Sequence, residues 1–127
     1  MPPVPRPLVT VARRFHFDAA HHLPRHPGRC RHVHGHGYEL EVHWQGPVDP
    51  DSGMVVDFAD LEREVDERVL RALDHTDLND RFENPTAENV AVWIWDRLVE
   101  AGLPILEVRL HETPTCLVVY RGEHAPD

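Results

Sequence analysis

The stretch HGYELEVHWQ, residues 36–45, alternates apolar side chains with acidic and polar ones. A repeat of two residues is typical of a β-strand that buries one face. The run that leads into it, Cys30-Arg31-His32-Val33-His34-Gly35-His36, brings a thiol and three histidines into seven residues. The sequence therefore predicts a half-buried strand over His36–Gln45 with chemically versatile side chains at its start.

Similar alternation predicts three further strands. They cover Leu8–Ala20, Ile105–Glu112 and Cys116–Arg121. Only Thr113-Pro114-Thr115 separates the last two, which predicts a β-hairpin. Prolines, glycines and charged residues predict a loop over Leu23–Val33 and a turn over Gly46–Gly53.

Two other segments repeat their apolar residues at helical spacing. In the first these residues are Phe58, Leu61, Val65, Val69 and Ala72, and in the second they are Val90, Ile94 and Leu98. Thr86 is a suitable N-cap for the second helix and Gly102 a suitable stop. Residues 73–85 are rich in Asp and are predicted to be irregular. The order ββααββ predicts an α+β fold in which a four-stranded antiparallel sheet carries two helices on one face.

The 127 residues are expected to form one domain over residues 8–122, with a flexible Pro-rich arm, 1–7, and a tail, 123–127. A small sheet has exposed edges, and pairing these edges between subunits predicts a symmetric oligomer. The arm lacks the apolar segment of a secretory signal, and no apolar run approaches the roughly 20 residues of a membrane helix. The two cysteines, Cys30 and Cys116, could pair, but the lack of a signal favours reduced thiols in a cytoplasmic protein. Cys116 begins an apolar run and is expected to be a small buried hydrophobe.

The net charge of -9 argues against general nucleic-acid binding. It does not exclude a small anionic substrate, because five arginines fall in the first quarter of the chain. These are Arg13, Arg14, Arg25, Arg29 and Arg31. Guanidinium groups hold phosphates well, although an ordinary solvated side chain is the simpler interpretation of each one singly.

The histidines before the central strand have the spacing of a metal site. His34 and His36 are two residues apart, so on a strand their imidazoles point to one face. A third imidazole from the upstream pair His21-His22 would complete three corners of a tetrahedron, a pattern typical of a catalytic zinc site with an open position. A nearby cation would favour the reactive thiolate form of Cys30. The alternative is chance, since the chain has eleven histidines.

Three other groups of residues are candidates for chemistry, each with a plainer alternative. Asp74 beside His75 could serve as a general acid or base, or could belong to a polar loop after a helix. Glu112 could accept two parallel N–H bonds from a guanine- or pterin-like ring edge, or be a surface residue before a turn. Thr86 and Glu88 stand at a helix N-terminus, where they cap it and complement its dipole or contact a ligand.

A set of motifs runs in order over residues 15–122. It comprises Phe17-Asp18-Ala19-Ala20-His21, residues 30–36, Val48-Asp49-Pro50 with Gly53-Met54, Asp57-Phe58-Ala59-Asp60-Leu61, Leu73-Asp74-His75 with Leu78-Asn79, residues 84–89 with Trp93-Ile94-Trp95-Asp96, Glu112-Thr113 and Val119-Tyr120-Arg121-Gly122. Together these motifs resemble the 6-pyruvoyltetrahydropterin synthase / 6-carboxytetrahydropterin synthase family. The resemblance implies the tunnelling fold, in which the strands of three subunits close a barrel and two trimers stack into a hexamer.

The resemblance also implies a role for each candidate residue. His21, His34 and His36 correspond to the Zn²⁺ ligands, Cys30 to the catalytic thiol, Asp74 and His75 to proton-transfer partners supplied by a neighbouring subunit, Glu112 to the anchor of the pterin ring, and Thr86 and Glu88 to a second stretch that contacts the pterin.

The spacing in the thiol motif distinguishes branches of the family. Three residues separate Cys30 from His34, as is typical of the bacterial 6-carboxytetrahydropterin synthases of the queuosine pathway. Those enzymes convert 7,8-dihydroneopterin triphosphate to 6-carboxy-5,6,7,8-tetrahydropterin, acetaldehyde and triphosphate. The alternatives are a 6-pyruvoyltetrahydropterin synthase, another pterin enzyme of this fold and a non-catalytic zinc-binding module. His22 and His32 depart from related bacterial sequences and bear on side-chain selectivity.

Overall fold

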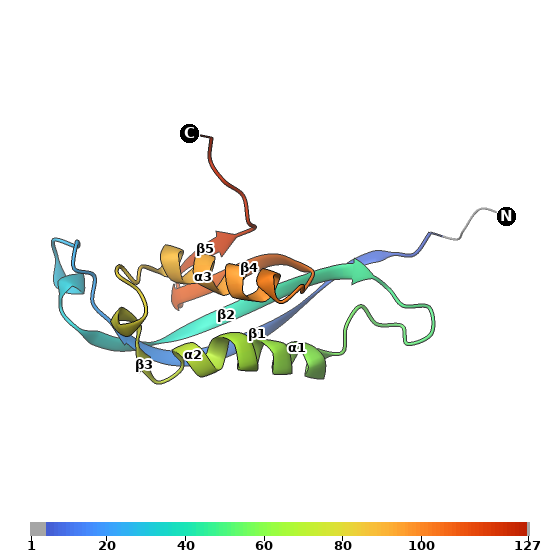
Figure 1. Ribbon diagram of the computed structural model, residues 1–127, viewed down its shortest axis with the longest axis horizontal. Helices are drawn as coiled ribbons and strands as arrows, with labels where there is room; N and C mark the ends of the chain where they lie inside the picture. Colours follow the sequence, from blue (N-terminus) through green and yellow to red (C-terminus); the bar gives the residue numbers. More distant parts are fainter. Residues whose placement is uncertain (1–4, 127) are drawn as a thin grey trace.

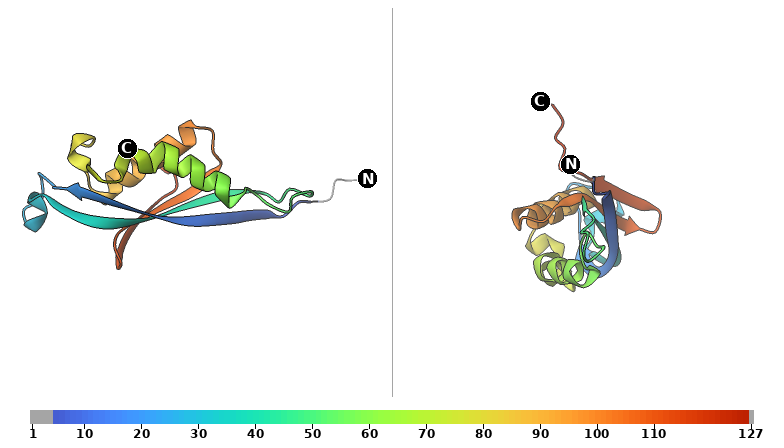
Figure 2. Two further views of the ribbon diagram at one scale, coloured as in Figure 1. Left: turned by 90° about the horizontal axis from the view of Figure 1, so that it is seen from below. Right: turned by 90° about the vertical axis from the view of Figure 1, so that its right-hand side faces the viewer.

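The computed structural model describes residues 5–126 and shows a twisted sheet with its longer helices on one face (Figures 1 and 2). The strands are β1 (Leu8–His21), β2 (His34–Pro47), β3 (Thr76–Asp77), β4 (Ile105–Thr113) and β5 (Cys116–Tyr120). The helical segments are η1 (Arg29–Arg31), α1 (Phe58–Val65), η2 (Asp66–Leu70), α2 (Arg71–Leu73), η3 (Leu78–Asp80) and α3 (Ala87–Glu100). The predicted α+β class is confirmed. Residues 1–4 of the predicted arm and Asp127 of the predicted tail lie outside the described residues.

The prediction of a four-stranded antiparallel sheet was wrong in part. Its order is β3-β1-β2-β4-β5, so it has five strands in place of the predicted four. It is also mixed, because β3 runs parallel to the end of β1, with Ala19 opposite Thr76 and Ala20 opposite Asp77. A strand of two residues is too short to show alternation, and it fell within the segment that was predicted to be irregular.

The two central strands are longer than predicted. They pair continuously from Leu8 opposite Pro47 to His21 opposite His34. Both predicted strands stopped short at this end of the ladder, because histidines on one face alternate with Ala20 and Gly35 on the other and the apolar–polar repeat is lost. The extension matters for the site, since it includes His21 and His34 in regular strand geometry.

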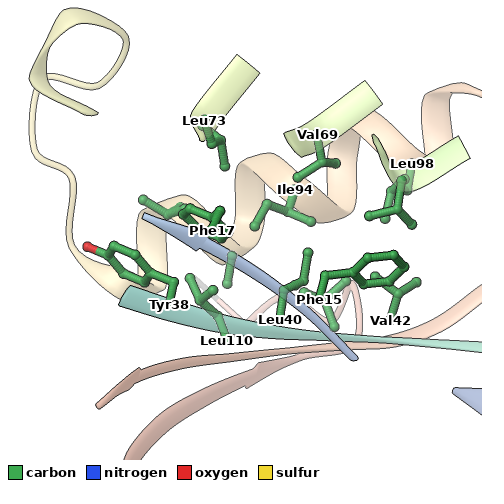
Figure 3. Close-up of a cluster of buried hydrophobic side chains, with 14 of the residues drawn as sticks. Phe15, Phe17, Tyr38, Leu40, Val42, Val69, Leu73, Ile94, Leu98 and Leu110 are labelled. Carbon is green, nitrogen blue, oxygen red and sulfur yellow. The ribbon is translucent and has the colours of Figure 1, made fainter. Parts of the chain in front are cut away.

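The core lies between the sheet and the helices. The buried side chains of β1 and β2 face α3 and the continuous helical run formed by α1, η2 and α2 (Figure 3). Phe17 stacks on Tyr38 across the ladder, with ring centroids 4.8 Å apart, and Leu40 and Leu110 continue the same apolar face. Burying each such side chain contributes about 1.5–3 kcal/mol. This packed face positions the polar residues at its end.

The predicted helices are confirmed at their ends. Asp57 accepts a hydrogen bond from the backbone N–H of Ala59 at the start of α1. Thr86 is the N-cap of α3 and accepts one from the N–H of Asn89 at 3.1 Å. Gly102 follows α3 with a φ of +81°, a left-handed conformation that glycine adopts without strain. Within residues 5–126, no helix is long and apolar enough to cross a membrane.

The opposite face of the sheet carries charged side chains where the helix face carries apolar ones. His111 and Glu41 lie 2.9 Å apart, and Glu107 is only 4% exposed. Burial raises the pKa of Glu107, but hydrogen bonds donated by Arg109 and Arg121 outweigh it and hold that pKa below its usual value. The carboxylate is thus paired, as a buried charge must be.

Candidate metal centre and adjoining cavities

Three imidazoles meet at the end of the ladder between β1 and β2. His21 lies directly opposite His34, and His36 is opposite Ala19, so the two-residue repeat of both strands points all three rings to one face. The Nε2 atom of His21 is 3.2 Å from the Nε2 atom of His34 and 3.2 Å from that of His36. The sheet therefore brings together the three predicted ligands as one cluster.

Each of these rings directs its other nitrogen at a backbone carbonyl. The Nδ1 atom of His21 lies 3.0 Å from the oxygen of Pro85, that of His34 lies 2.8 Å from the oxygen of His32, and that of His36 lies 3.4 Å from its neighbour's oxygen. A carbonyl only accepts, so Nδ1 carries the proton and donates. In a neutral imidazole Nε2 is then a bare lone pair, and three such lone pairs face one another.

This arrangement fits a metal ion. Zinc–nitrogen bonds of about 2.0–2.1 Å in a tetrahedron put neighbouring nitrogens about 3.3 Å apart, close to the 3.2 Å separations of the Nε2 atoms. Imidazoles whose second nitrogen donates to a backbone carbonyl are the usual form of such ligands. Burial lowers the pKa of His21, which keeps this ring neutral and able to bind a cation.

Tyr38 contacts the buried ring of His21. Its hydroxyl lies 3.2 Å from the Nδ1 atom of His21, and its ring lies 4.3 Å from that of His36. The side chain is fully buried, and burial together with the charge of Glu112 raises its pKa, so the hydroxyl stays protonated. Neither Tyr38 nor Pro85 was singled out from the sequence, because their contacts with His21 join distant parts of the chain.

Changing Tyr38 to Phe is expected to weaken metal binding without unfolding the protein. The ring is retained, but the hydroxyl beside Nδ1 of His21 is lost, and loss of such a partner typically lowers metal affinity about 10- to 100-fold. Competition with a chromogenic chelator measures the change. Tyr120→Phe, on β5, is the matched control and should leave affinity unchanged; equal affinities for all three proteins would contradict the role of Tyr38.

A cavity of about 580 Å³ adjoins the cluster of His21, His34 and His36, called the metal-type cluster below. Cys30, His34, His36, Glu112 and Cys116 are among the residues that line it. The prediction that Cys116 is buried was wrong: the side chain is exposed at the start of β5, an edge strand, where no neighbouring strand covers it. The cavity thus offers two thiols, two imidazoles and a carboxylate to a small molecule.

The Asp74–His75 pair lies beside a different cavity. That cavity has a volume of about 500 Å³ and is lined by His36 and His75 but not by Cys30. His75 has a φ of +59°, and it is the one residue other than glycine with positive φ in the described part of the chain. Such a conformation costs energy and is common at functional sites.

Backbone contacts with β1 hold this pair. The N–H of Asp18 donates to Asp74 at 3.0 Å, and the N–H of His75 donates to the oxygen of Asp18 at 2.7 Å. The hydrogen bond from Asp18 lowers the pKa of Asp74, and the nearby imidazole of His75, 3.0 Å away, acts in the same direction. Asp18 was not proposed as a site residue, although it stands in the motif that ends at His21.

Of the remaining candidate site residues, some lie at the histidine cluster or its cavities and others do not. Glu112 lies over the cluster, with its Oε1 atom 3.7 Å from Nε2 of His21. Thr86 serves as a helix cap, the plainer of its two interpretations, and neither it nor Glu88 lines the two cavities above. Of the five arginines, Arg14 pairs with Glu41 at 2.9 Å. Arg29 lines a further cavity, of about 360 Å³, together with Cys30.

Fold and site define a class of protein: a small α+β domain in which a metal-type cluster of three histidines adjoins a thiol-lined cavity. The chain belongs to the 6-pyruvoyl tetrahydropterin synthase family, whose model matches residues 10–123. The predicted resemblance is therefore confirmed.

Individual relatives carry the names of two pterin synthases. The 6-carboxy-5,6,7,8-tetrahydropterin synthase of Synechocystis is 40% identical, over 87% of this chain and 91% of that protein. The human 6-pyruvoyl tetrahydrobiopterin synthase is 36% identical, over 89% and 91%. The solved structure of the Caenorhabditis elegans 6-pyruvoyl tetrahydropterin synthase superposes with a TM-score of 0.85 at 33% identity and covers 94% of this chain and 100% of that one.

Proposed function

We propose that the protein is a zinc-dependent 6-carboxy-5,6,7,8-tetrahydropterin synthase. It would convert 7,8-dihydroneopterin triphosphate to 6-carboxytetrahydropterin, acetaldehyde and triphosphate in the cytoplasm, as a step of queuosine biosynthesis. The observation that carries the proposal is the cavity in which Cys30, two of the three clustered imidazoles and Glu112 converge. The three-residue spacing between Cys30 and His34 and the Synechocystis relative favour the carboxy branch.

The residues have separate tasks in this reaction. His21, His34 and His36 would hold the zinc ion, which would supply Lewis acidity for the side-chain hydroxyls of the substrate. Glu112 accepts N–H bonds from the edge of the pterin ring and orients it. Cys30, as thiolate, removes a proton from a side-chain carbon of the substrate.

The second proton transfer is assigned to His75, oriented by Asp74. Within one chain Cys30 and His75 line separate cavities, which supports a site completed by His75 of a neighbouring subunit. Two further features favour an oligomer. Leu117 and Val119 on the edge strand β5 are 46% and 45% exposed, and no helix within residues 5–126 covers the charged sheet face. We therefore propose a hexamer of two trimers, with residues 8–122 as its domain.

The leading test is incubation of the zinc-loaded protein with 7,8-dihydroneopterin triphosphate, with products identified by mass spectrometry. We expect 6-carboxytetrahydropterin and acetaldehyde. A 6-pyruvoyl product would transfer the protein to the branch of its human relative and leave the site assignments intact. No conversion by protein with bound zinc would contradict both, and would direct attention to another pterin substrate or to a binding module.

A further inference from the structure

Glu112 lies closer to the histidine cluster than its proposed role as anchor of the pterin ring requires. Its Oε1 atom lies 3.7 Å from Nε2 of His21 and 4.0 Å from Nε2 of His36. These are the nitrogens whose lone pairs face the shared centre of the cluster. The carboxylate therefore lies on the side of the cluster that borders the cavity, where three histidines leave a tetrahedral site open.

The backbone aims this side chain. Leu110 and Glu112 are two residues apart on β4, so Glu112 continues the face that carries the core and, beyond it, the three histidines. At Glu112 the pairing of β4 with β5 shifts: His111 is opposite Leu117, but Thr113 is already opposite Cys116. Glu112 is thus the extra residue of a β-bulge, a device that re-aims a side chain and is frequent near active sites.

The distances are close to those of a fourth ligand. Ligand atoms of a tetrahedral zinc site stand about 3.3 Å apart, and the Oε1 atom of Glu112 is already 3.7 Å from Nε2 of His21 and 4.0 Å from Nε2 of His36, so a small movement of the carboxylate brings it to ligand spacing from these two nitrogens. Three neutral imidazoles leave the full charge of a divalent ion uncompensated, and a carboxylate halves it. Glu112 is also the one carboxylate that lines the cavity beside these rings among the described residues.

Glu112 cannot bind a metal ion and hold the edge of a pterin ring at the same time. Accepting two parallel N–H bonds from a pterin edge engages both carboxylate oxygens, so neither oxygen is left to bind a metal ion. The side chain is about one-third exposed and borders the 580 Å³ cavity, so it has space to turn from the histidines towards a ring.

We propose that Glu112 is the fourth ligand of the resting metal site and is released from it when the pterin ring binds. This inference rests on the proposed function and deepens it, because arrival of the ring opens the coordination position that the substrate hydroxyls then use. In the absence of a pterin the carboxylate keeps that position closed to water and to other ligands.

Cobalt(II) in place of zinc tests the exchange, because its visible absorption reports the number and type of ligands. The Glu112→Gln protein should still bind one cobalt ion through its histidines, with a changed absorption spectrum and a zinc affinity lower by at least about tenfold. Glu100→Gln, a change at an exposed position at the end of α3, is the control and should match the wild type.

Pterin without a side chain, which has no hydroxyls to offer the metal, provides the second arm. Added to the wild-type cobalt protein, it should move the spectrum towards that of Glu112→Gln, and added to that variant it should have no effect. Identical spectra of wild type and Glu112→Gln would overturn the inference. If zinc-loaded wild type still converted the triphosphate substrate, the proposed function would stand without it; a wild type that bound neither zinc nor cobalt would overturn both.

Discussion

Replacing Cys30 with Ala is expected to abolish most turnover of 7,8-dihydroneopterin triphosphate while leaving one zinc ion bound per chain. Proton transfer by a positioned side chain typically contributes about 10²- to 10⁴-fold to a rate, and we expect a loss of this size in kcat. Cys30 lies outside the histidine cluster and is only half-buried, so the variant should keep its fold and its metal. Turnover is measured by product mass spectrometry and zinc by elemental analysis.

The second cysteine provides an internal control. Cys116 lines the same cavity but has no assigned role, so Cys116→Ala should keep turnover near that of the wild type. Near-normal turnover of Cys30→Ala would show that the base is another group.

A mixing experiment tests whether the site is shared between subunits. Cys30→Ala and His75→Ala should each be inactive alone. Reassembled together, they should regain part of the activity, because some interfaces then combine an intact Cys30 with an intact His75 from the neighbouring chain. Failure to regain activity in mixed oligomers would place both residues in one subunit's site.

Replacing His34 with Ala is expected to remove the metal. Two imidazoles remain. Losing a residue that hydrogen-bonds to a ligand typically lowers metal affinity about 10- to 100-fold, and losing the ligand itself should lower zinc affinity by more than that. His34 is half-exposed at the strand end, so little packing is lost. Zinc content after dialysis measures the effect. The thermal midpoint gives a second readout, since a chelator should lower it for the wild type and not for the variant.

His32→Ala is the matched control for that experiment. Its imidazole is outside the cluster, and its contribution to the site is the backbone carbonyl that accepts from Nδ1 of His34, which the substitution retains. Zinc retained by His34→Ala, or lost equally from His32→Ala, would contradict the assignment of His34 as a ligand.

Much of this protein could be predicted from local patterns. The two-residue alternation of 36–45 and the helical spacing from Phe58 onwards identified the main strands and both helices, because periodicity follows from one element facing one core. Spacing also identified the imidazole pair, since residues i and i+2 of any strand share a face. The order of the motifs identified the family, which the match over residues 10–123 confirmed.

Other features depended on contacts between distant segments. β3 exists because the end of β1 offers it free backbone groups, and Asp18 orients Asp74 across 56 residues of chain. The exposure of Cys116 follows from the place of β5 at the sheet edge, which its apolar neighbours do not reveal.

The element types and the pairing of His34 with His36 follow from spacing along the chain, and the order of the motifs indicates the family and, through it, His21 as the third candidate ligand. The convergence of the three lone pairs, the carbonyl and hydroxyl partners of the rings, and the place of Glu112 beside them depend on the folded sheet. This is because strand register sets which residues become neighbours. A shift of one residue would turn His21 to the opposite face of the sheet from His34.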